Sequence, residues 1–132
     1  MIFEMTNQIR VSNIQEGQRW YEIFLNKKPD YIPHEGFAEW ELIPGCWLQV
    51  AQGIPATESG PIRFGVSNLE DEQKRLVQQL NIEHFEIQSR PEVPVKWVTF
   101  NDPWGNQLGL FEYLDKNAEK ARFNTIFGMS KV

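Results

Sequence analysis

The chain has 132 residues, of which 41% are hydrophobic and 23% charged, so it can build one domain with a buried core, and its composition excludes a disordered or fibrous protein. The formal net charge is −5, with 18 acidic and 13 basic residues and no run of lysine or arginine, which excludes a nucleic-acid partner held by electrostatics. No apolar run approaches the roughly 20 residues of a membrane span, and the first ten residues lack a signal-peptide pattern, so we expect a cytoplasmic protein without a membrane partner.

The first half of the chain predicts a strand followed by a helix. Residues 8–12 alternate polar and apolar side chains, as in a half-buried strand. Asn13 and Glu16 have the spacing of a capping box at a helix N-terminus. The apolar face of this helix follows the spacing i, i+3, i+4 and consists of Trp20, Ile23 and Phe24. We therefore expect this helix to lie on a sheet.

Two more strands are expected after a loop or irregular strand at residues 30–36. Residues 37–42 and 46–51 are the strand candidates, and the dipeptide Pro-Gly between them is typical of a turn. Residues 52–60 are rich in turn-forming residues and have no periodicity. They predict the connection between two halves of the chain.

The second half repeats the first at an offset of 55 residues. Residues 11–14 (VSNI) recur as residues 66–69 (VSNL), and Asp71 takes the place of Glu16 in the capping pattern. The apolar face of the second helix consists of Leu69, Leu76, Val77 and Leu80. A strand-cap-helix unit thus occurs twice, which indicates a duplication.

The rest of the chain predicts a hairpin and a third helix. Residues 83–90 contain an apolar alternation, and two strand-forming runs then flank the turn Asp-Pro-Trp-Gly at residues 102–105. Each half is therefore expected to contain a strand, a helix and three strands. Residues 115–127 are expected to form a helix with an apolar side made by Ala118, Phe123, Ile126 and Phe127.

These features together resemble the vicinal oxygen chelate superfamily, which includes glyoxalase I, extradiol dioxygenases, and fosfomycin and bleomycin resistance proteins. The resemblance rests on the duplicated unit, the VSN entry to each helix and the turn DPWGN, in which Trp104 replaces the acidic residue of the family's DPDGN. It covers roughly residues 5–114 and implies an α+β fold of two βαβββ modules. The modules would form a cupped mixed or antiparallel sheet with helices on the outside, plus a C-terminal helix.

The resemblance also implies domain boundaries and a site. Residues 1–132 would form a single domain, with module 1 at about 5–54, module 2 at about 60–114 and the C-terminal helix at about 115–128. In the superfamily a metal ion is held in the cup by side chains from the first and last strands of each module. The corresponding positions here are Thr6, Gln49, Pro61 and Gly109. None is a histidine or carboxylate, so we expect neither a metal nor another cofactor.

The alternation of side chains along the strands directs amide, arginine and aromatic residues into the expected cup. These candidate ligand-binding residues are Gln8, Arg10, Trp47, Gln49, Arg63, Gln107 and Phe111. Aromatic faces and guanidinium groups suit a small organic ligand that is aromatic or anionic. The alternative is that Arg10 and Arg63 pair with acidic neighbours and that tryptophan side chains fill the cup.

The sequence is compatible with three functions. The first is a metal-free binding protein of the bleomycin resistance type, with no catalytic residue. The second is a metal-dependent glyoxalase-like lyase or isomerase, or a dioxygenase, with a displaced metal site that includes His34, His84 or Glu112. The third is an interaction module that uses the C-terminal helix. The resemblance also implies a homodimer, because homodimers are common in the superfamily.

Overall fold

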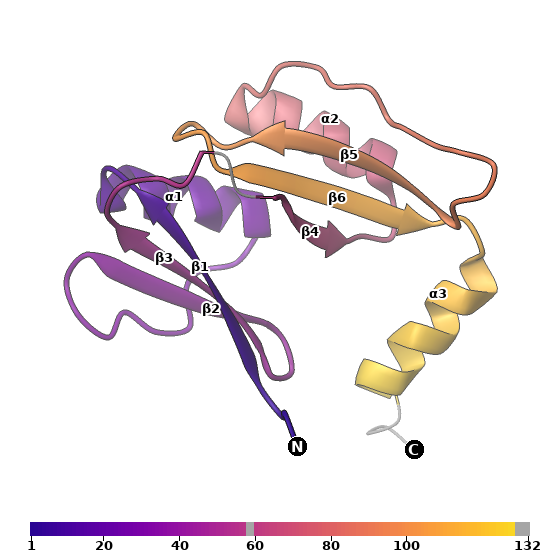
Figure 1. Cartoon of the computed structure of the whole chain (residues 1–132), viewed down its shortest axis with the longest axis horizontal. Helices are drawn as coiled ribbons and strands as arrows, with labels where there is room; N and C mark the ends of the chain where they lie inside the picture. Colours follow the sequence, from indigo (N-terminus) through magenta and orange to yellow (C-terminus); the bar gives the residue numbers. More distant parts are fainter. Residues whose placement is uncertain (58–59, 129–132) are drawn as a thin grey trace. The chain divides into compact units, whose positions relative to one another are not determined.

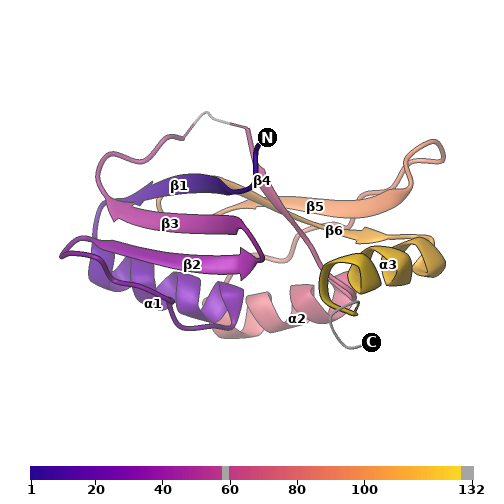
Figure 2. The ribbon, with the colours of Figure 1, turned by 90° about the horizontal axis from the view of Figure 1, so that it is seen from below.

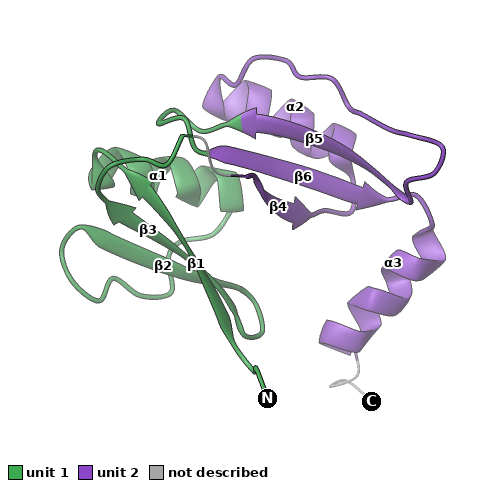
Figure 3. Cartoon of the chain, in the orientation of Figure 1, with its two compact units in different colours: residues 1–59, 101–106 green, residues 60–100, 107–132 purple. Residues whose placement is uncertain are grey.

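The structure, a computed structural model, describes residues 1–57 and 60–128, and the chain divides into two units (Figure 3). Unit 1 is Met1–Ser59 with Asn101–Asn106, and unit 2 is Gly60–Phe100 with Gln107–Val132. The first division falls within the connection that the sequence predicts at residues 52–60. Within the described ranges, no helix has the length and apolar character that crossing a membrane requires.

Unit 1 is a three-stranded sheet with one helix against it (Figures 1 and 2). Its elements in chain order are β1 (Met5–Val11), α1 (Ile14–Leu25), β2 (Phe37–Ile43) and β3 (Cys46–Gln52). The central strand is β3, with β1 parallel to it on one side and β2 antiparallel on the other. Antiparallel strands can follow one another through a tight turn, whereas the parallel pair needs a longer connection. Helix α1 is part of that connection.

The core of unit 1 lies between α1 and one face of the sheet. A Cβ atom built on Gly17 of α1 would lie 2.6 Å from Cγ2 of Val11, so glycine lets the helix lie this close to β1. The buried apolar side chains are Ile9, Val11, Ile14, Trp20, Tyr21, Phe24, Ala38, Trp40, Leu48 and Val50. Each strand contributes alternate residues to this core, so the remaining side chains of the sheet lie on the face away from α1.

Unit 2 repeats this construction and adds a C-terminal helix. Its elements are β4 (Ile62–Gly65), α2 (Leu69–Leu80), β5 (Val95–Asn101), β6 (Gln107–Tyr113) and α3 (Lys116–Phe123), followed by a π-helical turn, η1 (Asn124–Gly128). The strand order is β4-β6-β5, and β4 is parallel to β6. The buried apolar side chains are Leu69, Leu76, Val98, Phe100, Leu108 and Leu110.

Both predicted helix starts are confirmed. The side chain of Asn13 accepts a hydrogen bond from the backbone N–H of Glu16 at 3.1 Å, and the side chain of Asn68 accepts one from Asp71 at 3.0 Å. Both helices also end in the same way, at asparagines with φ of 54° and 53°. These residues are Asn26 and Asn81, which are again 55 positions apart. The strand-cap-helix repeat therefore extends to the C-caps, where asparagine tolerates the left-handed conformation.

The expected three strands after each helix are reduced to two strands and an isolated β-bridge. The bridges pair Tyr31 with Glu39 in unit 1 and Gln88 with Trp97 in unit 2. Pro29 and Pro33 lie on either side of the first bridge, and Pro91 follows the second. Because proline has no N–H to donate to a ladder, these segments cannot form longer strands.

The predicted turn at residues 102–105 is confirmed and belongs to unit 1. Asp102 Oδ1 accepts hydrogen bonds from the backbone N–H groups of Trp104 and Asn106, each at 2.9 Å, and Gly105 has φ of 88°. Asp102 Oδ2 accepts the hydroxyl of Tyr21 at 2.7 Å. Asn106 Nδ2 donates to Asp102 Oδ2 at 2.8 Å and to the carbonyl oxygen of Arg10 at 2.9 Å. The turn is thus fixed to α1 and β1 by buried polar groups.

The C-terminal helix is confirmed for Lys116–Phe123 and continues as η1. Asp115 caps it, because its side chain accepts hydrogen bonds from the N–H groups of Asn117 at 2.9 Å and Ala118 at 3.2 Å. No residue of α3 or η1 is buried, and Phe123 is 57% exposed. On the predicted apolar side of this helix, Ala118 and Phe123 are exposed, whereas Ile126 and Phe127 are half-buried.

Candidate functional site

The open face of unit 1 is the side of its sheet that α1 does not cover. Its side chains form three rows across β1, β3 and β2, in that order: Thr6, Trp47 and Glu41; Gln8, Gln49 and Glu39; Arg10, Ala51 and Phe37. The face therefore combines amides, carboxylates, aromatic rings and one guanidinium. It brings together four of the predicted ligand-binding residues, namely Gln8, Arg10, Trp47 and Gln49.

Hydrogen bonds connect the polar side chains of this face into one chain. Arg10 Nε donates to Gln8 Oε1 at 3.2 Å, and Gln8 Nε2 donates to Gln49 Oε1 at 3.2 Å. Gln49 Nε2 then donates to Glu39 Oε2 at 3.0 Å. The chain runs from a cation on β1 to a carboxylate on β2. Each amide is held in one orientation by its neighbours, so the surface is ordered before anything binds.

Aromatic pairs lie on both sides of this chain. Tyr31 and Trp47 stack with ring centroids 5.8 Å apart, and Trp47 Nε1 donates to Glu4 Oε2 at 2.6 Å. His34 and Phe37 stack at 5.0 Å with an interplanar angle of 15°. Each pair presents a flat surface next to polar groups, which suits a ligand with a planar part.

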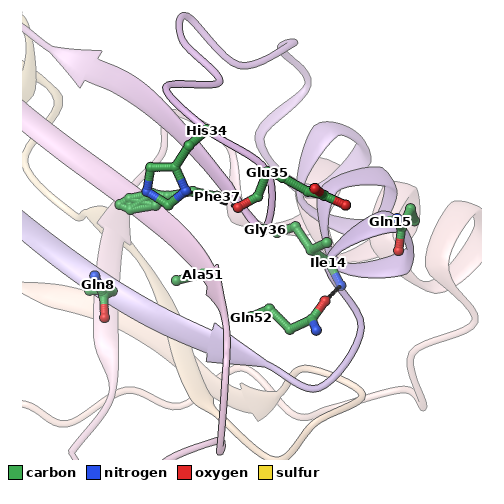
Figure 4. A pocket seen from close by; sticks show the side chains of 9 residues that line it. All are labelled: Gln8, Ile14, Gln15, His34, Glu35, Gly36, Phe37, Ala51 and Gln52. Carbon is green, nitrogen blue, oxygen red and sulfur yellow. Dashed lines mark hydrogen bonds between the residues drawn. The ribbon is translucent and has the colours of Figure 1, made fainter.

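A cavity of about 550 Å³ opens beside the His34–Phe37 pair (Figure 4). It is lined by Gln8, Ile14, Gln15, His34, Glu35, Gly36, Phe37, Ala51 and Gln52. Ala51, one of these lining residues, has a small side chain that lies between Arg10 and Phe37 in the third row. Gln52 Oε1 accepts a hydrogen bond from the N–H of Ile14 at 3.3 Å, the dashed line in Figure 4. This volume falls within the range of small-molecule pockets.

Unit 2 has an open face of its own, on the side of its sheet away from α2. It carries the other three predicted residues, Arg63, Gln107 and Phe111. Arg63 is paired with Gly109 across the two strands, and Gly65 is paired with Phe111. The ligand-binding roles of all seven residues remain predictions.

Neither predicted arginine pairs with an acidic side chain in the part of the chain that the structure describes. Among residues 1–57 and 60–128, no salt bridge includes Arg10 or Arg63, and the hydrogen bond of Arg10 to Gln8 is to a neutral amide. Tryptophan does not fill the open face of unit 1 either. Trp20 and Trp40 are buried in the core on the other side of that sheet, Trp104 lies in the turn at residues 102–105, and Trp47 lies on the open face. For unit 1, the alternative of paired arginines and a filled face is therefore not what the structure shows.

The strand register places different residues beside the expected metal positions. Gln8, rather than Thr6, lies directly across from Gln49, and Arg63, rather than Pro61, lies across from Gly109. With either Thr6 and Pro61 or Gln8 and Arg63 at these positions, the side chains offer amide, hydroxyl or guanidinium groups and no imidazole or carboxylate. Within the described residues, no three side chains of histidine, cysteine, aspartate or glutamate are grouped so that they could hold a metal ion. These positions do not fit the divalent ion that the superfamily implies.

The three residues suggested for a displaced metal site have other surroundings. His34 stacks on Phe37, and its Nδ1 lies 2.9 Å from the carbonyl oxygen of Glu35. His84 is exposed in the segment after α2. Glu112 is buried, and its Oε1 accepts a hydrogen bond from the N–H of Leu69 at 2.7 Å. Glu112 thus serves the start of α2.

Two contributors to the unit 1 face were missed by the sequence reasoning. Glu39 ends the hydrogen-bonded chain, and Phe37 forms an aromatic wall of the cavity. The alternation along β2 could have found them, because Ala38 and Trp40 are apolar core residues and their neighbours point the other way. The cavity itself had no sequence signal, since it depends on how the loop before β2 folds over the sheet.

Comparison with known proteins gives a clear result for structure only. No protein-family model matches the sequence, and no curated protein matches it significantly. A glyoxalase/bleomycin resistance protein from Catenulispora acidiphila is similar with a TM-score of 0.65 and 21% identity, over 83% of this chain and 97% of that chain. The fosfomycin resistance protein FosX from Listeria monocytogenes has a TM-score of 0.66 and 13% identity, over 85% and 93%.

A third similar structure is a glyoxalase/bleomycin resistance protein/dioxygenase from Alicyclobacillus acidocaldarius, with a TM-score of 0.64 and 13% identity, over 86% of this chain and 93% of that chain. All three likenesses extend over most of both chains, whereas their identities are too low to carry an activity across. They agree with the duplicated unit, the element order and the turn at residues 102–105. The chain therefore has the vicinal oxygen chelate fold, the fold of glyoxalase/bleomycin resistance/dioxygenase proteins.

Proposed function

We propose that this protein binds a small organic molecule with planar and anionic parts, without a metal ion and without changing the molecule. The residues that would hold it are Gln8, Arg10, Trp47 and Gln49 in unit 1, and Arg63, Gln107 and Phe111 in unit 2. The three similar structures carry names that refer to resistance to bleomycin or fosfomycin, which are organic molecules. Those names are consistent with a binding role on this fold.

The observation that carries this proposal is the hydrogen-bonded chain on the open face of unit 1. Arg10 is exposed, and its Nε is directed by Gln8 while its guanidinium has no carboxylate partner among the described residues. In a protein with 18 acidic residues, a guanidinium held in place by an amide is available to an external anion. The stacked pairs Tyr31–Trp47 and His34–Phe37 supply surfaces for a planar part of the same molecule.

The first prediction is that a library of planar organic acids contains a compound that stabilises the protein against heat. Binding to the native state raises the melting temperature. Arg10→Gln should weaken the affinity for that compound about ten- to one-hundredfold, because a charge-assisted hydrogen bond contributes roughly 1.5–3 kcal/mol. Thermal-shift screening followed by isothermal titration calorimetry measures both effects.

Arg19→Gln is the matched control, because Arg19 is an exposed arginine on α1 of the same unit. It removes the same charge and should leave the affinity unchanged. Equal losses in the two variants would count against a role for the open face. Metal analysis of the protein after dialysis tests the other part of the proposal, which near-stoichiometric zinc, nickel or iron would refute.

We also propose that the protein is a homodimer. The uncovered side chain of Phe123 and the exposed Ile2 and Phe3 are apolar surface that a second copy could bury. Multi-angle light scattering should give about twice the chain mass of 15.5 kDa. A mass near 15.5 kDa would contradict the dimer. Phe123→Glu should reduce the mass if α3 contributes to the contact, whereas a dimer that persists would place the contact elsewhere.

A further inference from the structure

Two glycines on the open face of unit 2 have a φ angle that other residues also adopt. Gly65 of β4 and Gly109 of β6 are absent from the glycines with positive φ, which among the described residues are Gly36, Gly45 and Gly105. Glycine in a strand interior weakens the strand, and it often marks a place where another group approaches closely. At these two glycines, the approaching groups are the side chains of Arg63 and Phe111.

Arg63 lies across Gly109. A Cβ atom built on Gly109 would lie 3.0 Å from Arg63 Cγ and 3.3 Å from Arg63 Nη1, and also 3.0 Å from the carbonyl oxygen of Val98. Because both the start and the end of the arginine side chain pass close to this position, the side chain lies along the sheet. A residue larger than glycine would push the guanidinium away from the strand.

Phe111 lies across Gly65 in the neighbouring pair of the ladder. A Cβ atom built on Gly65 would lie 3.0 Å from Phe111 Cζ and 3.1 Å from Cε2. The ring of Phe111 also stacks on Tyr113, with centroids 6.2 Å apart and an interplanar angle of 27°. Each strand thus provides a glycine over which a side chain of the other strand lies flat.

The guanidinium of Arg63 has no ion-pair or hydrogen-bond partner within residues 1–57 and 60–128. Of the carboxylates near these strands, Glu70 forms an ion pair with Lys96 of β5 at 2.7 Å. The carboxylate of Glu112 lies under the sheet at the start of α2. The carboxylates of these elements are therefore used elsewhere, and Arg63 is left for an anion from outside.

We propose that Arg63 and Phe111, seated over Gly109 and Gly65, form a platform that binds a planar carboxylate, with the ring of the ligand against Phe111 and its carboxylate at Arg63. This inference rests on the proposed binding function and names its ligand class for unit 2. A guanidinium matches the two oxygens of a carboxylate, and an aromatic ring matches a planar group attached to it.

The test is a titration of the full ¹⁵N-labelled chain with benzoate, followed by NMR. Benzoate should shift the amide signals of residues 63, 65, 107, 109 and 111 in a saturable way. Benzamide, which has the same ring without the charge, should bind about tenfold more weakly, since the ionised hydrogen bonds are lost. Acetate, which has the charge without the ring, should also bind more weakly.

Three variants separate the parts of the platform. Arg63→Gln should weaken benzoate binding about tenfold, and Arg122→Gln on α3 should leave it unchanged. Gly65→Ala adds a methyl group that displaces the Phe111 ring without touching the ligand, and it should weaken binding roughly two- to tenfold. Gly65→Ala also guards against misfolding as an explanation, since only a side chain has to move.

Two results would overturn the platform. One is an absence of saturable shifts at these five amides, and the other is unchanged benzoate affinity in Arg63→Gln. If benzoate fails while a library compound binds through Arg10, the platform is wrong and the proposed function stands. If neither binds, both are wrong.

Discussion

Replacing Asp102 with alanine is expected to lower the free energy of unfolding by about 3–5 kcal/mol, because it removes the acceptor for a whole buried network. The side chain of Asp102 is 4% exposed and accepts from the hydroxyl of Tyr21, two backbone N–H groups and the amide of Asn106. The variant leaves these donors buried without an acceptor. Leaving a buried donor unsatisfied costs about 1–3 kcal/mol, and the costs in one network do not add fully.

Urea denaturation followed by tryptophan fluorescence measures this loss. Asp115→Ala is the matched control, because Asp115 is an exposed cap of α3 and its loss should cost only about 1 kcal/mol. Tyr21→Phe removes one donor and should fall between the two. If Asp102→Ala lowers the free energy of unfolding no more than Asp115→Ala does, the hydrogen bonds of the turn do not stabilise the fold in the way their geometry indicates.

The same network fixes the protonation of Tyr21. Burial of the phenol, together with the charge of Asp102 and the hydrogen bond to it, raises the pKa of Tyr21 far above its ordinary value. The hydroxyl is therefore protonated at neutral pH and donates to Asp102. The turn resembles a family motif in the sequence. In this structure its role is to attach residues 102–105 to α1 through a buried hydrogen bond.

Local signals were sufficient for most of the fold. A capping asparagine and an acidic residue three positions later act within a single helical turn, so Asn13 and Asn68 could be identified without knowing the rest of the structure. The apolar faces of the helices depend only on spacing along the chain. The bridges of Tyr31 and Gln88 were expected to be full strands, although the prolines at positions 29, 33 and 91 were a local signal against longer pairing.

The site was less predictable, because it depends on register between strands. Alternation within β1 puts Gln8 and Arg10 on one face, and that much follows from sequence. Whether Thr6 or Gln8 stands across from Gln49 depends on pairing across 41 residues, and the structure selects Gln8. Glu39 joins the hydrogen-bonded chain through the antiparallel pairing of β2 with β3, and the alternation along β2 already indicated that it lies on this face.

The side chains on the two open faces determine which kinds of ligand these faces can bind. Amides and guanidinium groups are donors toward anions, whereas divalent metal ions are generally held by imidazole, carboxylate or thiolate ligands. Arg10 and Arg63 occupy equivalent strands of the two units, and both lack a carboxylate partner among the described residues. Both units therefore offer a positive group in place of negative ligands, which is why we favour binding of an organic anion.

Glu112→Ala should lower the free energy of unfolding by about 2–4 kcal/mol, because this carboxylate joins three elements of unit 2. It accepts the N–H of Leu69 at the start of α2, it lies 3.8 Å from the ammonium of Lys96 in β5, and it forms an ion pair with Lys116 at the start of α3. Glu112→Gln keeps the shape and one acceptor and should lose only about half as much. Denaturation with urea at neutral pH ranks the two variants.

The pH dependence of stability isolates the charge of Glu112. Burial alone would raise the pKa of Glu112, but the hydrogen bonds from Lys116 and Leu69 and the charge of Lys96 outweigh it and lower the pKa below its ordinary value. A carboxylate with a depressed folded-state pKa stabilises the protein fully above its unfolded-state pKa of about 4.3, and this contribution is lost as the pH falls through the folded-state pKa. The wild type should therefore lose more stability than Glu112→Gln on acidification from pH of about 5 downward. If the wild type and Glu112→Gln lose stability in parallel as the pH falls, Glu112 stabilises the fold through its shape and its hydrogen bond to Leu69, and not through its charge.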